Sequence, residues 1–178
     1  MKILFTLICV SLHVNASFLI EPYAGFNFNG GWSEDDTSST NQFSGTMYGG
    51  RVGIQKMGLM LGLDGRKGEW EIDNDTSTEF SYNHMAAFVG YDFPILLRVY
   101  ASYIIGGNAT DDDDNEYLEP SGYTLGVGYK FFPYLSANAE YGTINYKERE
   151  DVNGVNATTD ERGTYLLFSV SAPINLGL

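Results

Sequence analysis

The sequence predicts an all-β chain that folds as an eight-stranded, antiparallel, up-and-down transmembrane β-barrel. Three observations support this prediction. Apolar residues recur at every second position through eight segments, and the connections between these segments alternate between short and long. The 178 residues are also rich in Tyr, Phe and Gly, with 13, 11 and 21 of each, which favours strands and tight turns over helices.

The first 16 residues are expected to be a signal peptide, and residues 17–178 are expected to form the barrel. Lys2 is followed by the short apolar run ILFTLICVSL, and VNA, which ends at Ala16, supplies the small residues of a cleavage site. The run is shorter than the about 20 residues that a spanning helix needs. Because Cys9 in this run is the only cysteine, the mature chain is expected to have no disulfide.

The first four strands are expected at residues 18–29, 45–55, 58–70 and 79–92. In FLIEPYAGFNF every second residue, starting from Phe18, is apolar, and LMLGLDGRK in the third segment repeats this pattern. The fourth segment is ambiguous, because Phe80 and Tyr82 begin one apolar row whereas Met85 belongs to another. A β-bulge near His84 would reconcile the two rows.

The last four strands are expected at residues 96–107, 121–132, 134–146 and 163–178. LRVYASYII and GYTLGVGYKFF alternate with the same period of two. The final segment, LLFSVSAPINLGL, keeps one apolar row as far as the last residue. These segments are longer than the five or six residues that are usual in soluble sheets, and they suit a tilted crossing of a bilayer.

The connections between the expected strands fall into two classes. Three are tight turns, at residues 55–58, 92–96 and 131–134. Four are long and polar, at residues 30–44, 71–78, 108–120 and 147–162. Short turns at one end and long loops at the other, with an even number of strands, are typical of bacterial outer-membrane barrels. Both termini are therefore expected in the periplasm, and the long loops outside the cell.

The two rows of each strand predict which face meets lipid. The second row consists mainly of Gly, Ser and Thr with a few charges, which suits a narrow lumen better than a solvated surface. The apolar row is then expected to face hydrocarbon, where a closed barrel is required because unpaired strand edges are not tolerated. A soluble sandwich or a lipocalin-like barrel is the alternative.

Four short stretches carry a resemblance to a known family. They are EPYAGFNF at 21–28, GYDFP at 90–94, GVGYKFFP at 126–133 and EYGTINY at 140–146. With them, the whole mature chain resembles the small eight-stranded outer-membrane β-barrels of Gram-negative bacteria, of the outer membrane protein A and opacity-protein type. The resemblance implies an outer-membrane location, a lipid and lipopolysaccharide environment, and a monomer. It implies no activity.

The last strand resembles the signal that the outer-membrane barrel assembly machinery reads, after periplasmic chaperones have delivered the chain. Members of the family commonly end in Phe, whereas this chain ends in Leu. The alternative is a strand that faces lipid and needs no recognition. The residues expected to form the assembly signal are Phe168, Val170, Ile174, Leu176 and Leu178.

The charges are strongly segregated. The formal net charge is −13, with 10 Lys and Arg against 23 Asp and Glu, which argues against a nucleic-acid partner. Most of the acids lie in or beside the long loops, where they are expected to form a solvated, self-repelling face. The more specific alternative is that these acids bind divalent cations, which bridge the loops to lipopolysaccharide. Its weak candidates are Asp111, Asp112, Asp113 and Asp114, which lack the Gly spacing of a calcium loop.

A second set of charges falls on the inward row, where an eight-stranded barrel leaves room only for side chains. Unpaired charges there would be costly, so we expect an ion-pair network that closes the lumen. Residues 51 and 62 are expected to pair across the first turn, with Asp64 diagonal to Arg51. An ion-conducting path is the alternative. The residues of the expected network are Glu21, Arg51, Asp64, Arg66, Arg98, Lys130 and Glu140.

No catalytic constellation accompanies these charges. The mature chain has a single histidine, His84, and Ser81 is three residues away and hence on the opposite strand face. We therefore expect no enzyme activity, no cofactor and no metal, and a structural or surface-interaction role, adhesin-like, with an extracellular partner that loop sequence does not specify. The alternatives are a lipid A-modifying enzyme and a narrow ion-conducting pore.

Overall fold

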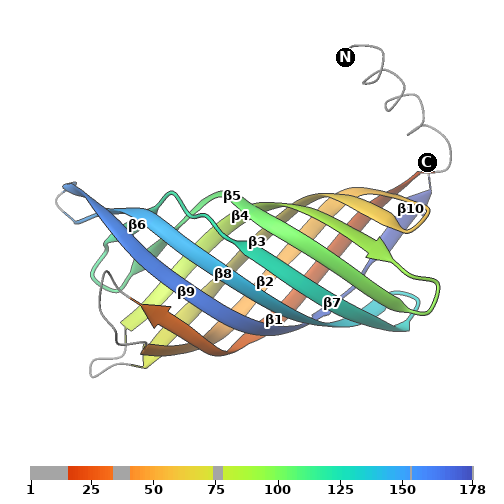
Figure 1. Cartoon of the computed structure of the whole chain (residues 1–178), viewed down its shortest axis with the longest axis horizontal. Helices are drawn as coiled ribbons and strands as arrows, with labels where there is room; N and C mark the ends of the chain where they lie inside the picture. The colour runs from red at the N-terminus through yellow and green to blue at the C-terminus, as the bar shows by residue number, and fades with distance from the viewer. Residues whose placement is uncertain (1–15, 34–40, 74–77, 153, 178) are drawn as a thin grey trace, which may run out of the picture.

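The computed structural model describes residues 16–33, 41–73, 78–152 and 154–177, and these form a sheet of ten strands (Figure 1). Every paired strand runs antiparallel to its neighbours. The strands are β1 (Ser17–Ser33), β2 (Asn41–Lys56), β3 (Leu59–Asp73), β4 (Thr78–Asp92), β5 (Leu97–Asp111), β6 (Glu116–Leu118), β7 (Tyr123–Phe132), β8 (Leu135–Glu150), β9 (Asn156–Ser171) and β10 (Ile174–Gly177).

The sheet closes into a barrel with eight positions around its ring. β6 and β7 both lie between β5 and β8, so together they fill one position. β9 and β10 both pair with β1 and fill another. The predicted last strand is interrupted near Pro173, because proline has no N–H to give to the ladder. The predicted all-β, eight-stranded, up-and-down barrel is confirmed.

The strands extend further toward the long loops than the sequence predicted. β1 continues to Ser33, β2 begins at Asn41, and β9 begins at Asn156 rather than at residue 163. These added lengths are mostly polar and carry single inward aromatic residues such as Trp32 and Phe43, too few to show an apolar alternation. β6 was also missed, because its three residues lie inside a segment that reads as an acidic loop.

The turn between β2 and β3 fixes the register of the charged residues. Met57 and Gly58 occupy its two central positions with φ of 51° and 85°, as a type I′ hairpin requires. Lys56 then pairs with Leu59, and Arg51 lies directly opposite Asp64. The predicted pairing of residues 51 and 62 was wrong by two residues, because the turn comes later in the chain than was assumed.

The ambiguous fourth strand has a simple explanation. β4 alternates between outward and inward residues without interruption from Glu79 to Gly90, so the predicted bulge near His84 was wrong. The irregularity lies in the facing strand, where Ile105 of β5 has no partner between the pairs formed by Met85 and Ala86. Both rows of β4 are partly apolar because its inward row helps to build an aromatic interior.

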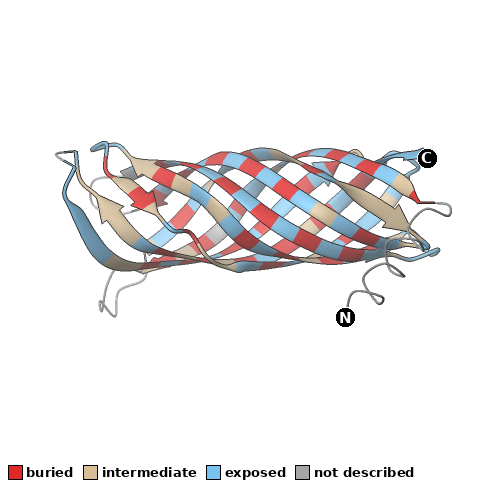
Figure 2. Cartoon of the chain, turned by 90° about the horizontal axis from the view of Figure 1, so that it is seen from above, coloured by how far each residue is buried: buried red, intermediate tan, exposed pale blue. Residues whose placement is uncertain are grey.

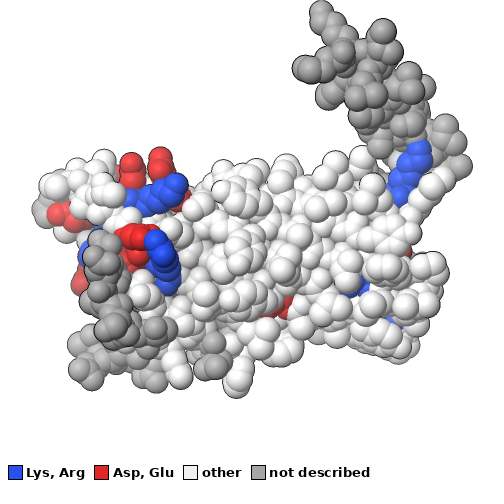
Figure 3. Space-filling model, viewed as in Figure 1, with Lys and Arg blue, Asp and Glu red and all other residues white. Residues whose placement is uncertain are grey.

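The two faces of the wall differ in exposure and in charge. Exposed and buried residues alternate along the strands and give a chequered pattern in Figure 2. The exposed row is mostly apolar in the middle of the wall, with Leu61, Leu63 and Val89 among its members. Figure 3 shows Asp, Glu, Lys and Arg gathered at the long-loop end of this face, with few in the middle. No helix among the described residues is long and apolar enough to cross a bilayer.

Candidate functional site: the lumen and its mouth

Arg51 is the centre of the charged lumen. Its Nη2 atom lies 2.6 Å from Oε1 of Glu140, its Nε 3.2 Å from Oδ2 of Asp64, and its Nη1 3.4 Å from Oε1 of Glu21. Glu21, Arg51 and Asp64 stand side by side on β1, β2 and β3, whereas Glu140 reaches across from β8. All four side chains are at most 1% exposed, so the contact spans the interior of the barrel.

Two further arginines extend this cluster in both directions along the barrel. Nη2 of Arg66 lies 2.9 Å from Oδ2 of Asp64 and 3.3 Å from Oε2 of Glu140. Nη1 of Arg98 lies 2.6 Å from Oε1 of Glu21. Three arginines therefore meet three carboxylates in one connected ion-pair network, and their formal charges cancel. Such mutual pairing offsets the high cost of burying charge.

Lys130 lies apart from the other six predicted residues. Its Nζ pairs with the carboxylate of Asp92, which also accepts a hydrogen bond from Nε2 of Gln55 at 3.1 Å. The predicted place of Lys130 in the network was therefore wrong. The sequence placed Asp92 in a turn and gave it no role, but as the last residue of β4 it can still turn its side chain toward the lumen.

Tyrosines complete the network, and the sequence analysis missed them. Oη of Tyr100 donates to Oε1 of Glu140 at 2.7 Å, and Oη of Tyr23 donates to Oδ1 of Asp64. The guanidinium of Arg51 lies 4.2 Å from the ring centroid of Tyr100 and 4.7 Å from that of Tyr23. Both tyrosines share a strand row with a network residue, which is the signal that could have revealed them.

An aromatic layer fills the lumen between the network and the long loops. Trp70 lies 4.2 Å from Tyr82, 5.1 Å from Phe43 and 6.0 Å from Trp32, measured between ring centroids. Offset and tilted ring pairs at these distances stabilise a packed interior. Each side chain of the layer is 5% exposed or less. We define the aromatic layer as Trp32, Phe43, Trp70, Phe80, Tyr82, Tyr117 and Tyr146.

His84 belongs to the edge of this layer. It is buried, its Nε2 lies 2.7 Å from Oη of Tyr146, and its ring lies 4.7 Å from that of Tyr82. Ser81 is exposed on the opposite face of β4. The structure therefore separates the histidine from the serine that a hydrolytic pair would need.

The opposite end of the lumen holds a small apolar cluster of Leu19, Met60 and Phe88 and a group of amides and hydroxyls. Nδ2 of Asn138 donates to Oγ of Ser169 at 3.2 Å and to Oγ of Ser171 at 3.0 Å, and Oγ of Ser136 donates to Oδ1 of Asn138 at 3.2 Å. All four residues are buried on the inner faces of β8 and β9. The interior thus changes from a mixed end with amides, hydroxyls and a small apolar cluster, through ion pairs, to aromatic rings.

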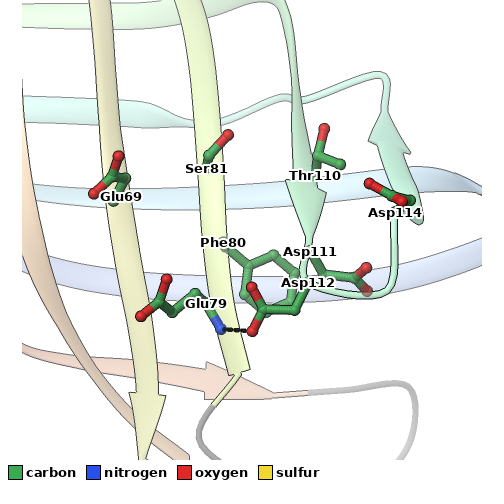
Figure 4. Close-up of a pocket in the computed structure, with 8 residues that line it drawn as sticks. All are labelled: Glu69, Glu79, Phe80, Ser81, Thr110, Asp111, Asp112 and Asp114. Carbon is green, nitrogen blue, oxygen red and sulfur yellow. Dashed lines mark hydrogen bonds between the residues drawn. The ribbon is translucent and has the colours of Figure 1, made fainter.

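The mouth at the long-loop end has an acidic pocket of about 380 Å³, which is lined by residues of β3, β4 and β5 and of the turn after β5, among them Glu69, Glu79, Asp111, Asp112 and Asp114 (Figure 4). Much of the carboxylate capacity there is already used by the backbone. Oδ1 of Asp111 accepts from the N–H of Asn115 at 2.9 Å, and Oδ2 of Asp112 accepts from the N–H of Glu79 at 2.8 Å. Within the described part of the chain, no three His, Cys, Asp or Glu side chains are grouped so as to hold a metal ion.

Two ionisable groups at this end of the barrel have pKa values shifted by their surroundings: the phenol of Tyr117 and the carboxyl of Asp160. Burial, and then the nearby carboxylate of Asp111, raise the pKa of the Tyr117 phenol, so the ring caps the aromatic layer in its neutral form. On the outer wall, Nε of Arg162 donates to Oδ1 of Asp160 at 2.9 Å. This hydrogen bond lowers the pKa of the Asp160 carboxyl below its ordinary value.

The remaining predicted residues lie on the outer wall or outside the described residues. Phe168, Val170, Ile174 and Leu176 of the expected assembly signal are exposed on β9 and β10. Leu178, residues 1–15 of the expected signal peptide, and the loop acids at residues 34–36 lie outside the described residues.

Comparison with solved structures finds outer-membrane proteins of similar fold. The structure is similar to that of Neisserial surface protein A (NspA), with a TM-score of 0.59 and 17% sequence identity over 88% of this chain and 97% of that one. The chain has the fold of the small outer-membrane β-barrels. No protein-family profile matches the sequence, and no curated protein matches it.

Two other outer-membrane proteins are similar at lower scores. OprG from Pseudomonas aeruginosa has a TM-score of 0.45 at 8% identity, covering 89% of this chain and 96% of OprG. A major outer membrane protein from Thermus thermophilus has a TM-score of 0.45 at 17% identity, covering 89% of this chain and 99% of that one. The assignment of the fold rests on NspA.

Proposed function

We propose that this chain is an integral protein of the bacterial outer membrane with a structural or surface-interaction role, adhesin-like, and with its acidic loops outside the cell. The fold and the apolar outer row of the wall support this location, because a closed barrel leaves no strand edge unpaired in hydrocarbon. NspA is, by its name, a surface protein, which agrees with the proposed exposure of the loops.

The observation that carries the proposal is the filled lumen. Contacts from Arg51 to Glu140 cross the interior from β2 to β8, and the aromatic layer lies above them. An interior of this kind leaves the loops and the outer wall as the surfaces that can meet a partner. We therefore propose a lumen closed by ion pairs, in place of a narrow pore.

The same interior supports a role without catalysis. His84 is buried against Tyr146, away from Ser81, so this histidine is not placed to activate that hydroxyl as a nucleophile. The rival class is a lipid A-modifying enzyme. Mass spectrometry of lipid A from cells with and without the gene separates the two, with an empty vector as the control. A change in acyl-chain number would contradict the proposal.

The partners proposed for this barrel are the lipids and lipopolysaccharide around it and the machinery that inserts it. Phe168 and Val170 point outward on β9, where an assembly factor could read them while the strand is still unpaired. We propose a monomer that needs no cofactor. The acidic mouth is proposed as a solvated face, and the net negative charge of the chain disfavours nucleic acid.

The proposed topology has a direct test. Protease added to whole cells is expected to cut near residues 34–40 or 111–119, and to spare the turn at Met57 and Gly58. Lysed cells provide the control, since the enzyme then reaches both sides of the membrane. Cleavage at the tight turns of intact cells, with both loops protected, would reverse the proposed orientation.

A further inference from the structure

The outer wall is hollowed where β6 ends and β7 begins. β6 stops at Leu118 and β7 starts at Tyr123, so residues 119–122 interrupt the strand position between β5 and β8. A cleft of about 400 Å³ lies beside this interruption and extends over β8 and β9, which are neighbours in the sheet (Figure 1). Because Tyr103 and Thr164 in its lining are exposed, the cleft opens on the outer wall and not into the lumen. Six of the residues that line it are Tyr103, Ser121, Thr143, Asn145, Arg162 and Thr164.

A guanidinium stands at the rim of the cleft, and a neighbouring carboxylate orients it. Nε of Arg162 donates to Oδ1 of Asp160 at 2.9 Å, and Nη2 of Arg162 pairs with Oδ2. Asp160 is anchored in turn by Nδ2 of Asn145, which donates to its Oδ1 at 3.0 Å. The side chain of Arg162 is still 66% exposed, and Lys147 is exposed just beyond Asn145 on β8. The cleft thus combines cations at its rim with the hydroxyls of Ser121, Thr143 and Thr164.

The cleft lies at the level where the outer row of the wall changes from apolar to polar. From the short turn upward, the outer row of β8 is Leu135, Ala137, Ala139, Tyr141, Thr143, Asn145 and Lys147. At a rise of about 3.3 Å per residue and a tilt of about 40°, the strand climbs about 25 Å from Leu135 to Asn145, which is the height of the apolar band of an outer-membrane barrel. Tyr103 pairs with Tyr123, and both are exposed, as is typical of tyrosines at a membrane interface. Lipid headgroups are therefore expected to lie level with the cleft.

We propose that this cleft binds the phosphorylated sugar headgroup of a lipid in the outer leaflet, the headgroup that lipopolysaccharide presents there. Arg162 donates to the phosphate, because a guanidinium fits phosphate oxygens well. The hydroxyls of the cleft bond to those of the sugar, the ring of Tyr103 packs against its apolar face, and the acyl chains follow the apolar wall. The inference deepens the proposed lipopolysaccharide partner and rests on the proposed outer-membrane location. It fails separately, because lipid can surround a barrel that holds no headgroup in a specific site.

Native mass spectrometry of the folded barrel in detergent micelles, with purified lipid A as the probe, tests the site. Arg162→Gln is expected to lower the affinity for lipid A about fivefold, the effect of removing one cation beside an anionic headgroup. Lys67→Gln is the matched control, because it removes the same charge from the exposed row of β3, away from the cleft, and it is expected to keep the affinity. Equal losses in the two variants would show unspecific attraction and would overturn the proposal.

A steric variant gives a second test that does not depend on charge. Thr143→Phe fills the cleft and is expected to lower the affinity for lipid A at least as much as Arg162→Gln does. Ala139→Phe adds a ring to the same outer row of β8, closer to the short turn and outside the cleft, and is expected to bind like the unchanged barrel. Undiminished binding by Thr143→Phe would contradict a headgroup seated in the cleft.

Two altered probes identify what the cleft holds. Lipid A stripped of its phosphates is expected to bind the unchanged barrel and Arg162→Gln equally, since the group that Arg162 contacts is then gone. Glucosamine 1-phosphate, a sugar phosphate without acyl chains, is expected to displace little lipid A at equal concentration. Continued discrimination by Arg162 against the stripped lipid would show that this residue does not bind the phosphate. Full displacement by glucosamine 1-phosphate would assign the cleft to a soluble sugar phosphate, and either result would overturn the proposal.

Discussion

Replacing Glu140 with alanine removes the carboxylate that contacts both Arg51 and Arg66 in the ion-pair network. Arg51 loses its shortest ion pair, at 2.6 Å, Arg66 loses one of its two, and Tyr100 loses the acceptor of its hydroxyl. Breaking a buried pair by removing one partner typically costs about 3–5 kcal/mol. Asp64 still contacts both arginines, at 3.2 and 2.9 Å, so the expected loss in the free energy of unfolding lies at the lower end, about 3 kcal/mol.

Urea unfolding of the barrel in detergent micelles measures this loss. The only two tryptophans of the chain, Trp32 and Trp70, both lie in the aromatic layer, so their fluorescence reports directly on the interior. Glu69→Ala, which removes an exposed acid from β3, is the matched control and is expected to change stability by less than about 0.5 kcal/mol. Adding Arg51→Ala to Glu140→Ala is expected to recover part of the loss, because one stranded charge is then gone.

The result that would refute this reasoning is a Glu140→Ala barrel as stable as the control. The ion pairs would then stabilise the folded barrel no more than hydration stabilises the same charged groups when they are separated. A loss of stability in Glu140→Ala that the double variant does not reduce would show that Glu140 acts through packing and not through its charge.

Two further predictions rest on local geometry. Gly126→Ala is expected to destabilise the barrel by about 1–3 kcal/mol in the same urea assay, because the added Cβ would lie 2.3 Å from the ring of Tyr100. Gly65→Ala is the control, since a Cβ at that position would have no heavy atom within 4 Å, and it is expected to leave the stability unchanged. Arg162→Gln is expected to raise the pKa of the Asp160 carboxyl toward its ordinary value, and an NMR titration that shows no rise would contradict the hydrogen bond between them.

The division of the chain into strands and turns could be predicted because each strand must show one face to lipid and the other to the lumen. That alternation is written in the order of the residues, and it holds for strands such as β5 and β7. The inward charges could be predicted for the same reason. Arg51 and Glu140 share their rows with Gly, Ser and Asn. The side chain of a charged residue on such a row must point into the lumen, because the other row faces lipid.

The partner of Lys130 and the aromatic layer could not be predicted, for different reasons. The height of a side chain in a barrel depends on the tilt and stagger of the strands, which no single segment encodes, so Lys130 and Glu21 appeared level. Alternation distinguishes two rows without saying which faces inward when both contain aromatic residues. Phe80 and Tyr82 were therefore indistinguishable from a row that meets lipid until the strand was placed in the closed sheet.

Conductance of the unchanged barrel in a planar bilayer is the measurement that tests the closed lumen most directly. The proposed interior, with Arg51 and Glu140 joined across it and the aromatic layer above, predicts little or no current under an applied voltage. A large, steady conductance that stays the same in Glu140→Ala and Arg51→Ala would contradict it, and would show that these residues line an open pore.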